Sequence, residues 1–142
     1  MKLQNLKVSD VMSTALITAK ERDTINHADI EMRLAQIRHL PVVDDRGHVV
    51  GVVSNRDIFR ALGQGSRKAV PVAEIMSRNV QTVRPEMPAH AAAEVLLSYG
   101  FGSLPVVNED EQLVGIVTET DLIHVAYQAL SGRTYEGRAM GD

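Results

Sequence analysis

Two short motifs contain the residue types that could bind a phosphorylated ligand. In each, Ser or Thr precedes Asp by three positions: Ser54-Asn55-Arg56-Asp57 and Thr118-Glu119-Thr120-Asp121. Hydroxyls and free backbone amides at a helix start can bind phosphate, and a neighbouring carboxylate can accept hydrogen bonds from two ribose hydroxyls. The same pattern is also a capping box, which satisfies the first amides of a helix and contributes about 1 kcal/mol. From these residues alone, both interpretations stay open.

The two motifs belong to an internal repeat with a constant offset of 64 residues and no gap. Comparison of residues 8–62 with 72–126 gives 13 identities in 55 positions. Most of the identities fall in short blocks, such as Leu40-Pro41-Val42-Val43 with Leu104-Pro105-Val106-Val107. Duplication is the economical explanation of such blocks at one offset.

Each half has the pattern of a small mixed α/β unit. Apolar residues at three- and four-residue spacing predict a helix, and short runs of β-branched residues beside Gly, Asn and Asp predict a hairpin. The first half has an extended piece over Ala15–Thr18, a helix over Thr24–Gln36, strands over Leu40–Val43 and His48–Ser54, and a helix over Ser54–Leu62. The second half has a helix between Pro88 and Gly100, strands over Leu104–Val107 and Leu113–Thr118, and a helix over Glu119–Leu130.

Composition excludes several classes of protein. The chain has 142 residues, 44% of them apolar and 23% charged, so it is long enough for a packed core and is not disordered throughout. It has no Cys, which excludes disulfides, a thiol nucleophile and a thiolate metal site. The formal net charge of −3 argues against a nucleic-acid partner, and no apolar run reaches the length of a membrane helix.

Other candidate sites have a weaker basis. His27 with Glu31 and His90 with Glu94 have i, i+4 spacing, but two ligands do not make a metal site, so we expect solvated helix-face pairs and no metal. Met12 and Met76 occupy equivalent positions of the repeat, which favours a role in core packing.

Taken together, the paired blocks resemble tandem CBS domains, a Bateman module, over roughly residues 8–130. The resemblance implies an α/β (α+β) fold: two tandem β-α-β-β-α CBS repeats packed sheet to sheet as one pseudo-two-fold module. We expect repeat 1 at residues 8–62, a linker at 63–71, repeat 2 at 72–130 and a mobile C-terminal tail at 131–142.

The resemblance also implies ligand-binding residues in the clefts between the repeats. The ribose would be held by Asp57 and Asp121, and phosphate would face Ser54, Arg56, Thr118 and Thr120. Backbone contacts to the base would come from Thr18 and Thr82, and the pocket wall would include Leu40, Pro41, Leu104 and Pro105. Members of the family often carry basic phosphate contacts just before the first strand of each hairpin, at the positions that correspond here to Arg38, His39, Gly102 and Ser103.

At these positions the two halves differ in charge. The first half has Arg38, His39 and Arg56, with Lys20 as a further basic candidate, whereas the second half places Glu119 inside its motif. Basic side chains bind phosphate through charge-assisted hydrogen bonds, which gives a preference for phosphate contacts from the first half. Because basic residues can come from a neighbouring repeat or subunit, both sites are retained.

The resulting prediction is a stand-alone, energy-sensing regulatory module in the cytoplasm. It would bind AMP, ADP, ATP, NAD(H) or S-adenosylmethionine as a regulatory ligand, require no cofactor, form a homodimer and signal to an unidentified effector protein. The alternative is a dimerising scaffold without a ligand. An enzyme is not expected, because no set of nucleophile, base and orienting residue is present.

Overall fold

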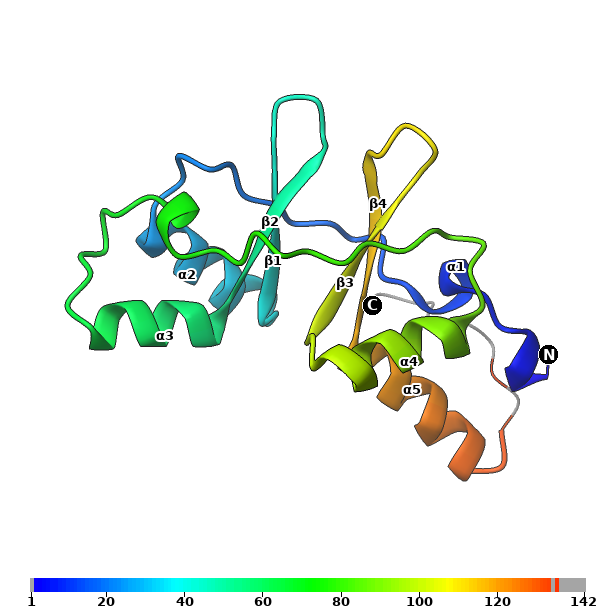
Figure 1. Ribbon diagram of the computed structural model, residues 1–142. Coiled ribbons are helices and arrows are strands. Elements are labelled where there is room, and N and C mark those ends of the chain that lie inside the picture. Colours follow the sequence, from blue (N-terminus) through cyan, green and yellow to red (C-terminus); the bar gives the residue numbers. More distant parts are fainter. Residues whose placement is uncertain (1, 134, 136–142) are drawn as a thin grey trace. The chain divides into compact units, whose positions relative to one another are not determined.

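The computed structural model describes residues 2–133 and 135, and the chain divides into two compact units (Figure 1). One unit is the middle stretch of the sequence, Ile17–Val80, and is called the inner unit for that reason. The other, called the outer unit, combines the two flanking stretches, Met1–Leu16 and Gln81–Asp142. Each unit contains one two-stranded antiparallel sheet. No helix formed by the described residues is both long enough and apolar enough to cross a membrane.

The two units have corresponding elements. Those of the inner unit are α2 (Ile25–Ala35), β1 (His39–Val43), β2 (Val49–Ser54), α3 (Asn55–Gly63) and the 3-10 turn η2 (Val72–Glu74). Those of the outer unit are the 3-10 turn η1 (Leu3–Asn5), α1 (Val8–Val11), α4 (Ala89–Tyr99), β3 (Ser103–Val107), β4 (Leu113–Thr118) and α5 (Glu119–Leu130). Both hairpins have the same register, including an irregularity before their last pair.

The observed elements confirm the predicted mixed α/β class and its two tandem repeats, with boundaries within one residue for most elements. The main difference is the extended piece before the first helix of each half. It forms no full strand, only single parallel bridges of Ala19 to Val42 and of Val83 to Val106. Because each segment pairs with its neighbouring strand at a single residue, it does not add a third strand to the sheet.

The leading segment of each repeat packs in the unit of the other repeat. In the outer unit the Ser13 N–H donates to Ile116 O at 2.9 Å, and the Ile116 N–H donates back to Ser13 O at 3.0 Å. In the inner unit Ser77 and Val52 exchange the equivalent pair of hydrogen bonds at 2.9 and 3.0 Å. Each hairpin is therefore extended by a backbone segment that lies far away in the sequence.

Methionines accompany these exchanged segments, as the sequence predicted for core positions. Met76 is 8% exposed in the inner core, and Met12 packs against the outer core. Each lies over a strand glycine: a Cβ on Gly51 would come within 2.6 Å of the Met76 Sδ, and one on Gly115 within 2.5 Å of the Met12 Sδ. The glycines allow the thioethers to lie directly on the sheet.

Part of the C-terminal segment contacts the outer unit. The Tyr135 side chain is 6% exposed among core residues that include Leu6, Val8 and Val11, and its hydroxyl donates to Asp10 O at 3.0 Å. The sequence predicted a mobile tail at 131–142, of which residues 134 and 136–142 lie outside the described part of the chain.

Candidate functional site

In the inner unit, the predicted Ser-x-x-Asp motif forms the start of α3. The Ser54 N–H donates to Asp57 Oδ2 at 2.8 Å, and the Asp57 N–H donates to Ser54 Oγ at 3.1 Å. The second carboxylate oxygen, Oδ1, lies 3.7 Å from the Arg60 guanidinium, and the Asp57 side chain is 20% exposed. The capping box is thus real, and it leaves part of the carboxylate accessible to a hydroxyl donor.

In the outer unit, the equivalent carboxylate is more enclosed. Both the backbone N–H and the Oγ1 hydroxyl of Thr118 donate to Asp121 Oδ2, at 2.7 and 3.3 Å. Asp121 is only 2% exposed, and Ser103 and Asp121 are the buried polar residues of the described chain. The two motifs therefore share a backbone geometry but differ in how accessible their carboxylates are.

The residues at the start of each hairpin lie beside these motifs. His39 is the partner of Ser54 across the inner hairpin, and Ser103 is the partner of Thr118 across the outer one. The Asn55 N–H also donates to Arg38 O at 3.0 Å, which holds the backbone of Arg38 against the start of α3. The fold thus brings Arg38, His39 and Ser54 together at one end of the inner hairpin.

The predicted wall residues lie in the hydrophobic cores. Leu40 and Leu104 have no exposed surface, and Pro41 and Pro105 are also buried. The carbonyls of these prolines accept hydrogen bonds from Ala19 and Val83 at 2.9 and 3.0 Å. Thr18 and Thr82, each half-buried, directly precede these bridging residues and so lie next to a strand edge in their own units.

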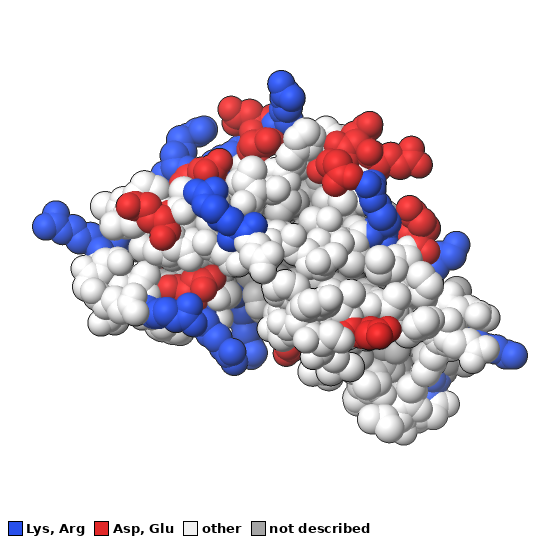
Figure 2. Space-filling model, viewed as in Figure 1, with Lys and Arg blue, Asp and Glu red and all other residues white. Residues whose placement is uncertain are grey.

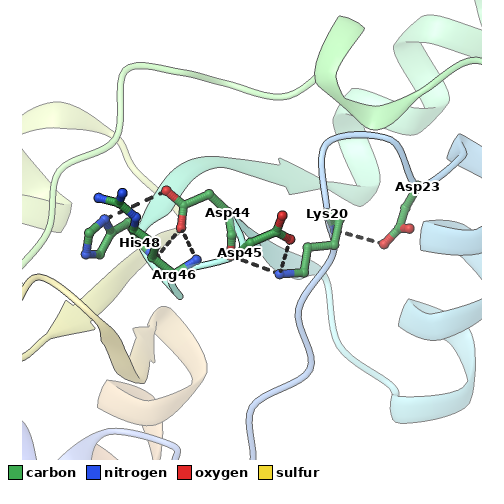
Figure 3. A network of polar contacts seen from close by, with 6 residues as sticks. All are labelled: Lys20, Asp23, Asp44, Asp45, Arg46 and His48. Atoms are coloured by element: carbon green, nitrogen blue, oxygen red, sulfur yellow. Dashed lines mark hydrogen bonds and ion pairs between the residues drawn. The ribbon is translucent and has the colours of Figure 1, made fainter.

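Lys20, the further basic candidate, lies elsewhere. Its Nζ donates to Asp44 O at 2.9 Å and approaches Asp45 Oδ1 at 3.4 Å, at the turn that joins β1 to β2 (Figure 3). This turn is at the opposite end of the hairpin from Ser54, so Lys20 does not lie beside the Ser54 motif. The repeat indicates instead that Lys20 stabilises this turn, because Arg84 occupies the equivalent position and donates to Asn108 O and to Glu111 in the turn of the outer hairpin.

The Asp44 side chain organises the same turn. Its Oδ1 accepts from the backbone N–H groups of His48 and Arg46, both at 2.9 Å (Figure 3). These hydrogen bonds, with that of His48 the strongest influence, lower the pKa of the Asp44 carboxyl below its ordinary value of 3.8. In the outer unit Asn108 makes the same two contacts through its amide oxygen, at 2.9 and 3.0 Å. These polar clusters therefore stabilise turns and are separate from the capping boxes.

Within residues 2–133 and 135, no group of three His, Asp or Glu side chains is placed to hold a metal ion. His27 Nε2 lies 3.9 Å from Glu31 on an exposed face of α2. On the face shown in Figure 2, cationic and anionic side chains are intermixed and do not form a single basic stripe.

Comparison with known proteins identifies the repeats. The family model described as "CBS domain" matches twice, at residues 8–64 and 72–127. The chain belongs to the CBS domain family. Its two CBS matches follow one another along most of the chain, so it contains a tandem CBS pair, as the motifs predicted.

Solved CBS pairs have the same fold. The CBS domain pair of protein MJ0100, in complex with 5'-methylthioadenosine and S-adenosyl-L-methionine, is 34% identical with a TM-score of 0.80, covering 85% of this chain and 99% of that one. The structure of CBSX2 in complex with AMP is 28% identical with a TM-score of 0.76, covering 87% and 98%. Both of these similar CBS pairs hold adenosyl compounds.

Among curated proteins, a homoserine O-acetyltransferase of Methanohalobium evestigatum is 36% identical over 120 residues, which is 84% of this chain. The chain spans only 24% of the length of that relative. The similarity to the acetyltransferase therefore covers a region with the length of a CBS pair, and the activity of the whole relative does not follow from it.

Proposed function

We propose that this CBS pair is a non-catalytic regulatory module that binds an adenosyl ligand at its two Ser/Thr-x-x-Asp motifs. The observation that carries the proposal is the pair of equivalent capping boxes, each with its Asp fixed by the backbone at the start of a helix. At Asp57, whose side chain is 20% exposed, a carboxylate held in this way can accept hydrogen bonds from the two hydroxyls of a ribose without reorganising. The adenosyl compounds in the similar CBS pairs support the same ligand class.

The remaining predicted residues complete the proposed sites. Thr18 and Thr82 would offer backbone groups to the base, and Ser54, Arg56, Thr118 and Thr120 would face the phosphate or another 5' substituent. The ligand would act by binding one arrangement of the module more tightly than another, and it can shift that equilibrium only by its difference in affinity. The cytoplasm, which contains the adenine nucleotide pool, is the proposed compartment, and the output would pass to an effector protein.

A thermal-shift panel tests the ligand class. Ligand-stripped protein is compared with and without AMP, ADP, ATP, NADH and S-adenosylmethionine. A ligand at about 100 times its Kd adds roughly 2.7 kcal/mol of stability, so a selective rise in Tm supports the proposal and identifies the ligand. The absence of a shift with every compound would favour the dimerising scaffold instead.

Substitutions of the two carboxylates separate capping from ligand binding. Asp57→Ala and Asp121→Ala should each lower Tm without ligand, because a capping box is lost. If the carboxylates bind ribose, each variant should also lose part of the ligand-dependent increment. Equal ligand increments in the wild type and in both variants would contradict the proposed sites.

We also propose that the module is a homodimer, because both units have large apolar side chains on the outer faces of their helices. Phe59 on α3 and Ile123 on α5 are repeat-equivalent and are 66% and 64% exposed. Leu34, Leu97 and Leu130 are each more than 75% exposed. A second copy of the chain presents the same apolar surfaces, so two copies can cover one another symmetrically.

The mass in solution tests this association. By light scattering after gel filtration, the wild type should have twice the mass of one chain, and Ile123→Glu or Phe59→Glu should shift it toward one chain. Ser98→Glu, at an exposed polar position of α4, is the matched control and should leave the mass unchanged. A wild-type mass equal to one chain would contradict the dimer.

A further inference from the structure

The surroundings of the two capping boxes differ in charge, although their backbones are equivalent. In the inner unit, Arg38 and Arg56 flank the box formed by Ser54 and Asp57. Neither guanidinium has a hydrogen bond or ion pair with any residue in the described part of the chain, and both side chains are exposed. Two cations that have no partner among the described residues therefore border the start of α3.

Backbone contacts hold the main chain of both arginines close to the motif. Arg38 O accepts from the N–H of Asn55, the first residue of α3, and Arg56 is the second residue of the same helix. His39 follows Arg38 as the first residue of β1 and is paired across the hairpin with Ser54. The amides at the start of α3 add a partial positive charge, which extends over the first turn of the helix.

The outer unit has no cation at the equivalent positions, and Glu119 adds an acid where the inner unit has Asn55. Gly102 and Ser103 replace the residues Arg38 and His39, and Thr120 replaces Arg56. The first turn of α5 contains two acids, Glu119 and Asp121. The Asp121 carboxylate is also nearly inaccessible and accepts both the amide and the hydroxyl of Thr118.

From this difference we infer that the chain divides ligand chemistry between its boxes: the inner box binds the phosphate of an adenine nucleotide, and the outer box accepts only adenosyl compounds without phosphate. The inference rests on the proposed adenosyl-binding function and specifies its ligands. Arg38 and Arg56 can each form charge-assisted hydrogen bonds with phosphate oxygens. A phosphate at the outer box would meet Glu119 and Asp121, and like charges disfavour binding.

Titration calorimetry on the ligand-stripped full chain tests the division with two probes, AMP and 5'-methylthioadenosine. These probes share the adenosyl group, and only AMP has a phosphate. Arg56→Thr places the residue of the outer box in the inner box and should weaken AMP binding about tenfold, with methylthioadenosine affinity unchanged within twofold. Arg22→Thr removes the same charge from an exposed position outside both boxes and should change neither affinity.

The reciprocal exchange tests the outer box. The double variant Glu119→Asn with Thr120→Arg gives that box the two middle residues of the inner one, and it should tighten AMP binding about tenfold in an Asp57→Ala background.

The possible outcomes separate the inference from the proposed function. Binding of neither probe by the wild type would overturn the proposed function and the inference with it. Binding of methylthioadenosine with equal effects of Arg56→Thr on both probes would retain the function and overturn the inference. An Arg22→Thr effect on AMP as large as that of Arg56→Thr would also overturn it, because net charge would then explain the preference.

Discussion

The inner and outer units share the order of their main helices and strands and the register of their hairpins, and a comparison of their residues shows which positions this common framework restricts. Both hairpins contain Leu-Pro-Val-Val in their first strand and Val-Gly in their second, and the register of the pairs is the same. The residues at turns and helix ends vary. The left-handed end of α2 is Gln36 (φ 57°), and the equivalent end of α4 is Gly100 (φ 68°). Packing that both units share therefore imposes a backbone conformation that the local residue does not always favour.

The largest expected difference concerns the glycines beneath the exchanged segments. A Cβ on Gly51 would lie 2.9 Å from Ser77 O, a backbone atom, whereas one on Gly115 would lie 3.2 Å from Ser13 O and would otherwise meet the flexible Met12 side chain. Gly51→Ala should therefore lower the free energy of unfolding by about 1–3 kcal/mol, and Gly115→Ala by less. Urea denaturation measures both. Adding Met12→Ala to Gly115→Ala should restore more of the lost free energy of unfolding than adding Met76→Ala to Gly51→Ala. Equal recovery in the two pairs would contradict the role of the Ser77 carbonyl.

The second largest difference is expected between the two Asp→Ala substitutions in the boxes, measured as the loss of free energy of unfolding. Asp121→Ala leaves the enclosed Thr118 amide without its acceptor, which costs about 1–3 kcal/mol. Asp57→Ala should cost about 1 kcal/mol, as for a typical cap, because Asp57 is 20% exposed and water can replace its contact. The comparison uses ligand-free protein in urea. A larger loss for Asp57→Ala would show that the burial of Asp121 does not determine its contribution.

A smaller effect is expected at the left-handed helix ends. Gln36→Gly should stabilise the chain by about 0.5–1 kcal/mol, because glycine adopts a positive φ without the Cβ conflict. Gly100→Gln should destabilise it by a similar amount. Thermal unfolding of both variants provides the check, and the same sign for both substitutions would mean that side-chain contacts outweigh backbone conformation there.

The smallest effect is a pH dependence that only one turn should show. Because the folded pKa of Asp44 is lowered, its contribution to stability is present above its ordinary pKa of 3.8 and is lost as the pH falls through the folded value. Asp44→Asn should remove this dependence and keep the turn, since Asn108 makes the same contacts in the outer unit. The measurement is Tm from pH 6 to pH 3. An unchanged acid slope in the variant would assign the dependence to other carboxyl groups.

The sequence predicted the hairpins and the principal helices because the blocks of the repeat contain strong local patterns. The Ser54 and Thr118 boxes were predictable for the same reason: both partners lie within four residues of each other. The role of Lys20 was not, since its partner Asp44 is 24 residues away and becomes close only when the hairpin forms. The enclosure of Asp121 also depends on packing that no local pattern describes.

The exchange of leading segments has a consequence for folding during synthesis. All of the inner unit, Ile17–Val80, is contiguous and can form as soon as that stretch has left the ribosome. The outer unit has to wait, because Ser13 pairs with Ile116 and the two are separated by about a hundred residues. During that interval Leu6, Val8 and Val11, nearly or fully buried in the finished fold, remain in water. The early N-terminal segment is therefore the part of a growing chain with the longest exposure to aggregation and to chaperones.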